Sequence, residues 1–205
     1  MMLGIRRMVV LLALAAGIAT AALAQEKTKK AAAKPPDEKA MMEAWEKAST
    51  PGEMHRKLEP IVGTFDARVR SWMDPAKPPE DTTGTSVNGW TLGNRFVEQK
   101  YEGTMMGQPF TGMGYVGYNN VKKKYESVWM DSMGTGMMWS VMTPDASGKV
   151  MTAKTSVDDP MTGKPMPIEE KITVADNDHH KFEMWGQGPD GKKFKMMEIE
   201  YTRKQ

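Results

Sequence analysis

From residue 63 onward the chain is divided into short segments of strand length, and turn-forming residues separate each segment from the next. The turns carry the Gly, Asn, Asp and Pro residues that hairpin connections require, as in Leu92-Gly93-Asn94 and Pro189-Asp190-Gly191. Polar and apolar residues alternate within the segments, so that Phe65, Ala67 and Val69 share one face of the first strand. This pattern predicts a β-rich domain in which each strand pairs with the next one along the chain.

Ten segments fit this pattern. Their predicted bounds are Thr64–Trp72, Thr82–Trp90, Arg95–Glu102, Phe110–Tyr118, Tyr125–Asp131, Thr135–Met142, Val150–Val157, Met166–Val174, Phe182–Gly186 and Phe194–Arg203. Because an open meander leaves two exposed edges, closure of the sheet on itself is the simplest arrangement for strands joined by short connections. We therefore expect an all-β fold, a single antiparallel up-and-down barrel of about ten strands preceded by a short N-terminal helix.

The N-terminal residues have the composition of a secretory signal peptide. Arg6 and Arg7 precede an almost wholly apolar run over residues 8–22, and Ala22-Leu23-Ala24 is a small-x-small cleavage site. The apolar run is shorter than the roughly 20 residues that span a bilayer. We expect a Sec-type signal peptide over residues 1–24, cleavage after Ala24, and a periplasmic or secreted protein with no stable membrane span after cleavage.

The remaining chain divides into three parts by composition. Residues 25–37 are rich in Lys, Ala and Pro and have no apolar periodicity, which predicts a disordered tether. Residues 38–60 place Met41, Met42 and Trp45 at helical spacing and predict an N-terminal helical segment. Residues 61–205 form the predicted β-barrel domain.

Composition excludes several classes of chemistry. The chain contains no cysteine, so disulfides, thiolate catalysis and Cys-ligated zinc are excluded. Its 28 basic and 26 acidic residues become balanced once Arg6 and Arg7 leave with the signal peptide, which argues against nucleic acid as a partner. Metalloprotease, nucleotide-binding and nucleophile motifs are absent from the sequence, so we expect no cofactor, no metal site and no assigned catalytic residue.

Methionine is unusually frequent, with 21 residues in the chain. Thioethers suit Cu(I), but the adjacent residues of pairs such as Met137-Met138 point to opposite faces of a strand. A copper site would need three or more sulfur atoms that converge from different strands. Packing of the core or of a pocket is the preferred interpretation, because methionine fills irregular apolar space well.

Several motifs in order resemble a bacterial family designated domain of unknown function 1579. They are His55-x-x-Leu58 with Gly63-Thr64-Phe65, Leu92-Gly93-Asn94-Arg95-Phe96, Phe110 to Asn120 with its repeated glycines, Trp129 to Gly136, Asp159 to Lys164, and Tyr201-Thr202-Arg203. The resemblance covers residues 51–204. This chain has Phe65 where the family usually has Trp and Asn94 where it has Gly, and neither change conflicts with the fold. The family brings no established activity.

A wider resemblance is to the lipocalin and fatty-acid-binding superfamily. In that superfamily a Gly-x-aromatic motif opens the first strand and a late arginine stacks across it. The resemblance implies that Gly63, Phe65 and Arg203 form the structural closure of a lipocalin-like barrel, with a cation–π contact of about 0.5–2 kcal/mol.

The segment from Trp129 to Trp139 combines aromatic, thioether, hydroxyl and carboxylate groups, the mixture that is typical of small-molecule pockets. The predicted ligand-binding residues are Phe96, Tyr118, Trp129, Met137 and Trp139 as the pocket lining, with Asp131, Arg95 and His55 as polar groups. Arg95 supplies a countercharge for an anionic ligand or for Asp131, and a structural Arg–Asp pair is the alternative. For His55, a structural role that orients the helical segment is the alternative.

Strand phase leaves three acids undecided. Glu98, Glu170 and Glu183 lie within predicted strands and point either inward or outward, and an inward carboxylate would need a partner or a ligand. The pair His179-His180 lies in a polar stretch for which a solvated loop is expected.

Together these features predict an exported β-barrel protein that binds a small apolar or amphipathic molecule. One alternative is an enzyme that uses the same cavity, with Asp131, His55 or Arg95 as its acid–base or electrostatic groups. The others are a packed, ligandless barrel with an envelope or assembly role and a Met-based copper binder. The oligomeric state and the identity of the ligand stay open at this stage.

Overall fold

The structure is a computed structural model that describes residues 37–188 and 190–205. The predicted signal peptide, residues 1–24, and residues 25–36 of the predicted tether lie outside the described residues.

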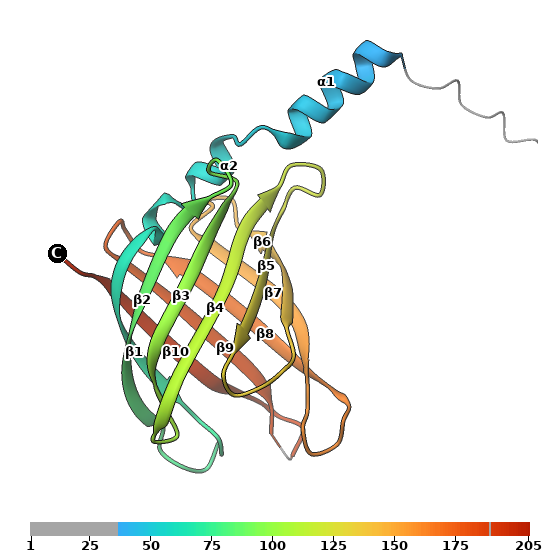
Figure 1. The fold of residues 1–205 in the computed structure, drawn as a ribbon. Coiled ribbons are helices and arrows are strands. Elements are labelled where there is room, and N and C mark those ends of the chain that lie inside the picture. The colour runs from blue at the N-terminus through green and yellow to red at the C-terminus, as the bar shows by residue number, and fades with distance from the viewer. Residues whose placement is uncertain (1–36, 189) are drawn as a thin grey trace, which may run out of the picture. The chain divides into compact units, whose positions relative to one another are not determined.

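Three short helical elements precede the strands (Figure 1): α1 (Glu38–Ser49), α2 (Glu53–Arg56) and the 3₁₀ helix η1 (Glu59–Ile61). The Asp37 carboxylate caps α1 by accepting the backbone N–H of Lys39, and the Asn120 side chain donates to the carbonyl oxygens of Lys47, Ala48 and Thr50 at its other end. The predicted short N-terminal helix is therefore confirmed.

Ten strands follow in the chain. They are β1 (Gly63–Ser71), β2 (Glu80–Thr91), β3 (Phe96–Met105), β4 (Gln108–Asn119), β5 (Lys124–Asp131), β6 (Met138–Pro144), β7 (Val150–Asp158), β8 (Pro165–Val174), β9 (His179–Gln187) and β10 (Lys193–Arg203). Each strand pairs antiparallel with the next, and β10 pairs with β1, so the sheet is a closed barrel (Figure 1). The predicted all-β, up-and-down, ten-stranded barrel is confirmed.

The register of the closing pair explains the alternation in the first strand. Phe65 lies opposite Arg203, and Val69 lies opposite Ile199. Phe65 and Val69 are buried while Asp66 is exposed, so one face of β1 is turned to the barrel interior and the other to solvent. The same period of two is followed around the barrel.

Two strands begin three residues from their predicted starts, and the others begin within two residues. β6 begins at Met138 instead of Thr135, because Gly134 and Gly136 offer no side chains to pack and favour an irregular connection. β9 begins at His179 instead of Phe182, because the Asp176 carboxylate accepts the backbone N–H of Asp178 and of His179 and tightens the turn. The second shift brings the two histidines into a strand.

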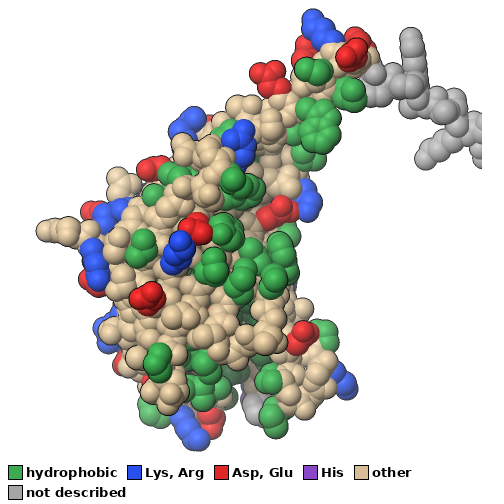
Figure 2. Space-filling model, in the orientation of Figure 1, with side chains coloured by type: hydrophobic (Ala, Val, Ile, Leu, Met, Phe, Trp, Pro, Cys, Tyr) green, Lys and Arg blue, Asp and Glu red, His purple; other side chains and the backbone are tan. Residues whose placement is uncertain are grey.

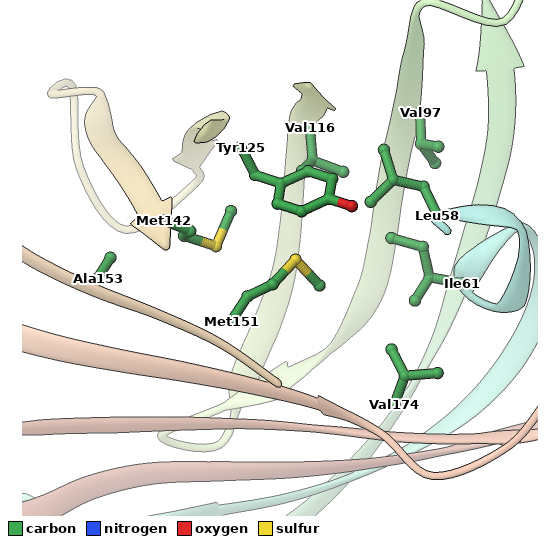
Figure 3. Close-up of a cluster of buried hydrophobic side chains, with 9 residues drawn as sticks. All are labelled: Leu58, Ile61, Val97, Val116, Tyr125, Met142, Met151, Ala153 and Val174. Carbon is green, nitrogen blue, oxygen red and sulfur yellow. The ribbon is translucent and has the colours of Figure 1, made fainter. Parts of the chain in front are cut away.

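One end of the barrel is closed by an apolar cluster that α2 and η1 help to build. Figure 3 shows its nine buried side chains, which are Leu58, Ile61, Val97, Val116, Tyr125, Met142, Met151, Ala153 and Val174. Leu58 and Ile61 come from the helical segment and meet side chains from β3, β4, β5, β6, β7 and β8. The Tyr125 hydroxyl donates to the Met54 carbonyl oxygen at 2.8 Å, which attaches α2 to the barrel.

A second cluster contains Ala67, Val69, Tyr101 and Phe110 from β1, β3 and β4. Partly buried side chains pack against it: Met105, Trp129, Met197, Ile199 and Tyr201. Methionines therefore serve both clusters as apolar packing, in keeping with the flexible shape of the thioether side chain.

The outer face of the barrel combines apolar side chains with ion pairs. Figure 2 shows hydrophobic side chains gathered over the face that carries β3 to β5, between scattered charged groups. On β8, β9 and β10 the outer face carries a network in which Lys195 contacts Glu183 and Glu198 and Lys181 contacts Glu198 and Glu200. The register turns Glu98 and Glu183 outward and Glu170 inward, which settles the orientation of the three undecided acids.

Candidate functional site

Trp129 and Asp131 occupy interior positions at the end of β5. Trp129 lies opposite Gly114 and Asp131 lies opposite Gly112. Because neither glycine has a side chain, the indole ring lies flat against the wall of β4, where any larger residue would collide with it. The indole Nε1–H donates to Asp131 Oδ2 at 3.0 Å, which holds the two predicted site residues together on the inside of the barrel.

Tyr118 and His55 form a separate group at the end closed by α2. Their rings meet edge to face with centroids 5.9 Å apart. The Nδ1 atom of His55 accepts the backbone N–H of Gly52 at 3.0 Å, and burial lowers the pKa of His55, so the neutral imidazole is favoured. The arrangement matches the structural alternative for His55, in which the imidazole orients the helical segment.

The other predicted residues lie on the outer face or in turns. Phe96, Met137 and Trp139 are exposed by 41%, 60% and 66%, and the register places Phe96 and Trp139 on the outer face. The Arg95 guanidinium donates to the Leu92 carbonyl oxygen at 3.0 Å and so belongs to the turn between β2 and β3. The expectation of one pocket lined by Trp129, Met137, Trp139, Tyr118 and Phe96 is corrected accordingly, because alternation places Trp129 and Trp139 on opposite faces.

The three predicted closure residues meet where β10 closes on β1. The Arg203 guanidinium lies 4.6 Å from the centre of the Phe65 ring and donates to the carbonyl oxygens of Val62 at 2.7 Å and Pro60 at 3.0 Å. Gly63 has φ = +134°, and a methyl group at this position would collide with the guanidinium.

Several interior side chains keep part of their surface accessible. The register turns Phe182 and Met184 of β9 and Ile199 and Tyr201 of β10 toward the inside, yet each is only partly buried, as is Trp129. By contrast, Phe65 and Val97 are 0% exposed in the same barrel. The inward-facing surface of these apolar side chains is therefore not fully covered by their neighbours.

Polar groups also line the interior. Near η1 they are satisfied: Asn88 donates to the Ile61 carbonyl oxygen at 2.8 Å and accepts from the Ser86 hydroxyl at 2.8 Å. Elsewhere they are not, because among the described side chains Ser140 Oγ and His180 Nδ1 are buried without a hydrogen-bond partner. Such unpaired buried groups are costly and mark places where a missing partner would be stabilising.

Glu170 is the buried acid of the interior. It is 5% exposed, pairs with Ala153 on β7 and with Met184 on β9, and burial raises the pKa of its carboxyl. The Ser140 hydroxyl lies close enough to the Glu170 carboxyl to offset part of this rise in pKa. The geometry between the two groups is not that of a good hydrogen bond. The two side chains form the Ser140–Glu170 pair.

His180 belongs to an aromatic stack at the β1–β10 seam. Its ring lies parallel to that of Tyr201 at 4.3 Å and meets the Phe65 ring edge to face at 4.7 Å. Burial, together with the nearby Arg203 charge, lowers the pKa of His180 to about 4. The expected solvated loop is therefore wrong for this residue, which is a neutral, buried member of β9.

The seam between β6 and β7 is the shortest ladder in the barrel, with two residue pairs, Thr143 with Thr152 and Pro144 with Met151. A groove of about 580 Å³ lies along the outer wall here and reaches Ala153 and Glu170. The groove on the outer surface therefore lies next to β8, the strand whose Glu170 carboxyl is buried on the inner side.

Two other kinds of feature are absent from residues 37–188 and 190–205. There, three or more His, Cys, Asp or Glu side chains do not gather in a cluster that could hold a metal ion. The helices at 38–61 are too short or too polar to cross a membrane.

Sequence reasoning missed Ser140 and His180 as interior polar residues and left the orientation of Glu170 undecided. A signal existed for Glu170, because it shares the period of two with Ile168 and Ile172, both apolar. For Ser140 and His180 the signal is weaker, since serine is found on both faces of sheets and histidine next to Asp-rich turns is usually solvated.

Comparison with known proteins places the chain in a family. The model described as protein of unknown function (DUF1579) matches residues 50–203, and the chain therefore belongs to this family, as the motifs predicted. A search of curated protein sequences finds no match.

Solved structures share the barrel. Rv2717c from M. tuberculosis is similar with a TM-score of 0.57 and 16% identity, over 76% of this chain and 100% of that one. The S-type phycobiliprotein lyase CPES from Guillardia theta is similar with a TM-score of 0.50 and 12% identity, over 76% of this chain and 99% of that one. At these identities the likeness supports the lipocalin-like fold alone.

Proposed function

We propose that this protein is exported and binds a small apolar or amphipathic molecule in the lumen of its barrel. The observation that carries the proposal is the partial accessibility of the inward-facing Trp129, Phe182, Met184, Ile199 and Tyr201. Apolar surface left in contact with water costs roughly 25 cal/mol per Å², so a molecule that covers these side chains gains that free energy on binding.

The chemical character of the interior supports the same function. Small-molecule sites are mostly apolar and carry a few polar groups that orient the ligand. Here Trp129 with Asp131, and the Ser140–Glu170 pair, supply such groups among aromatic and thioether side chains. Export is proposed from the sequence of residues 1–24.

The geometry favours binding over catalysis. Of the candidates for acid–base or electrostatic roles, Asp131 is bonded to Trp129 and lies six residues along β5 from Tyr125, whose hydroxyl contacts α2. His55 is in α2, and besides burial the Arg95 charge is close enough to lower its pKa, so Asp131 is separate from the other two. Two interior groups with shifted pKa values, Glu170 and His180, are also apart. Glu170 pairs with Met184, which lies four residues along β9 from His180 and so about 13 Å away. Neither group can activate the other.

Native mass spectrometry of the protein purified from its own host tests the proposal. We expect a mass excess over the denatured protein that disappears on denaturation and that equals one small molecule. The denatured mass should correspond to a chain that begins at Gln25. A native mass equal to the denatured mass, together with no binding of apolar fluorescent probes, would contradict ligand binding and favour a packed barrel. A mass that includes residues 1–24 in the mature fraction would contradict export by cleavage.

A further inference from the structure

The Ser140–Glu170 pair is the polar group of the interior that most lacks a partner. Ser140 is 3% exposed and its hydroxyl has no hydrogen bond, while the Glu170 carboxyl is 5% exposed and has the Ser140 hydroxyl as its polar neighbour. Its neighbours across the strands are the apolar Ala153 and Met184. Burying an acid in this way is unfavourable unless a partner supplies hydrogen-bond donors or an opposite charge.

Charge inside the barrel is unbalanced. The register turns three acids inward, Glu80, Asp131 and Glu170. Arg203 is the inward-facing base on β10, but its N–H groups are used by the carbonyl oxygens of Val62, Pro60 and Asn177. Among the described residues, the barrel interior therefore holds three acids and no free basic group to pair with them.

Aromatic faces line the same space. Trp129 lies flat against the wall of β4, and Phe182 and Tyr201 present partly accessible rings from β9 and β10. Aromatic faces attract cations as well as apolar groups, and the attraction is larger where water is excluded.

Resting on the proposed function, we propose that the ligand class is the hydrophobic primary amine, with the ammonium group bound by the Ser140–Glu170 pair and the apolar body in contact with the aromatic side chains of the lumen. An ammonium group carries three N–H donors and one positive charge. It donates to the Glu170 carboxylate and to Ser140 Oγ at once, which satisfies both unpaired groups and neutralises the acid.

Other ligand head groups fit this pair less well. A carboxylate would place a second negative charge beside Glu170, and like charges in a low dielectric repel each other strongly. An alcohol can hydrogen-bond to the pair but brings no countercharge. The amine is thus the head group that removes both the unpaired hydroxyl and the charge imbalance.

Isothermal titration calorimetry with decylamine, 1-decanol and decanoate tests this selectivity, because the three compounds differ only in the head group. We expect decylamine to bind the wild-type protein at least about tenfold more tightly than 1-decanol, and decanoate to bind most weakly. Glu170→Gln should abolish the preference for the amine, so that decylamine and 1-decanol bind this variant with affinities within about twofold of each other. Ser140→Ala should reduce the preference by a smaller factor.

The matched control is Glu169→Gln, which removes the neighbouring acid from the outer face, where it pairs with Lys193. This variant should keep the full amine preference. Equal or tighter binding of 1-decanol or decanoate by the wild type, or an unchanged amine preference in Glu170→Gln, would overturn the amine assignment while leaving ligand binding intact. Absence of binding for all three compounds would instead overturn the proposed function itself. Circular dichroism of each variant establishes that the barrel is folded.

Discussion

Arg203 connects three parts of the barrel, and its replacement gives a prediction that can be worked out from the structure. The guanidinium donates to the carbonyl oxygens of Val62, which follows η1, and Pro60, within η1, at 2.7 and 3.0 Å. It also donates to Asn177 before β9 at 2.9 Å and stacks on Phe65. Hydrogen bonds to charged groups contribute about 1.5–3 kcal/mol each, and the cation–π contact about 0.5–2 kcal/mol. Because such contributions overlap, we expect Arg203→Ala to lower the free energy of unfolding by about 3–5 kcal/mol.

Urea unfolding followed by tryptophan fluorescence measures this loss. With an m-value of about 2 kcal/mol per M, the midpoint should fall by about 2 M. Arg203→Lys retains the charge but not the planar fork of donors, so it should lose about half as much.

The control is Arg70→Ala, which breaks the exposed ion pair with Asp81 and should cost less than about 1 kcal/mol. If Arg203→Ala and Arg70→Ala destabilise the protein equally, the assignment of Arg203 as the closing residue is refuted.

Three further substitutions follow from the interior. Burial lowers the pKa of His180 to about 4, while the imidazole of the unfolded chain keeps its ordinary pKa of 6.5. As the pH falls from 6.5 to about 4, the unfolded state takes up the proton first, so the wild type loses up to about 1.4 kcal/mol of unfolding free energy per pH unit. His180→Phe should remove that slope in unfolding experiments between pH 7 and about 4. The pH dependence has the opposite sign for Glu170, because its raised pKa makes ionisation unfavourable in the folded state. Glu170→Gln should therefore raise the melting temperature at pH 8. This gain should vanish below pH 4.5, the ordinary pKa of the carboxyl. Finally, Gly63→Ala should lower the free energy of unfolding by about 2 kcal/mol or more in urea titrations, because a side chain at this positive φ collides with Arg203.

Much of the fold was predictable because its causes are local. Turn residues such as Gly93 and Gly163 adopt positive φ where the sequence indicated turns, and the alternation in β1 identifies its buried face. The strand starts at Met138 and His179 were not predictable in the same way, since glycine packing and the Asp176 turn decide them.

The candidate site was predicted only in part. Trp129 and Asp131 were expected to lie together, and the structure joins them by a hydrogen bond. Phe96 and Trp139 were expected in the same pocket, but their neighbours Val97 and Ser140 take the inner positions. A shift of one residue exchanges the two faces of a strand, so composition cannot assign an aromatic residue to the lumen without the register.

The sequence by itself determined the class of fold, the approximate number of strands and the family, because turn chemistry, alternation and ordered motifs act over short stretches of chain. The closing pair of β1 and β10 was implied by the lipocalin resemblance. Only the tertiary structure decided which polar groups meet inside. Ser140 and Glu170 lie 30 residues apart on β6 and β8, and His180 meets Phe65 across the β1–β10 seam. Contacts of this kind depend on strand register and barrel closure, which are properties of the whole sheet.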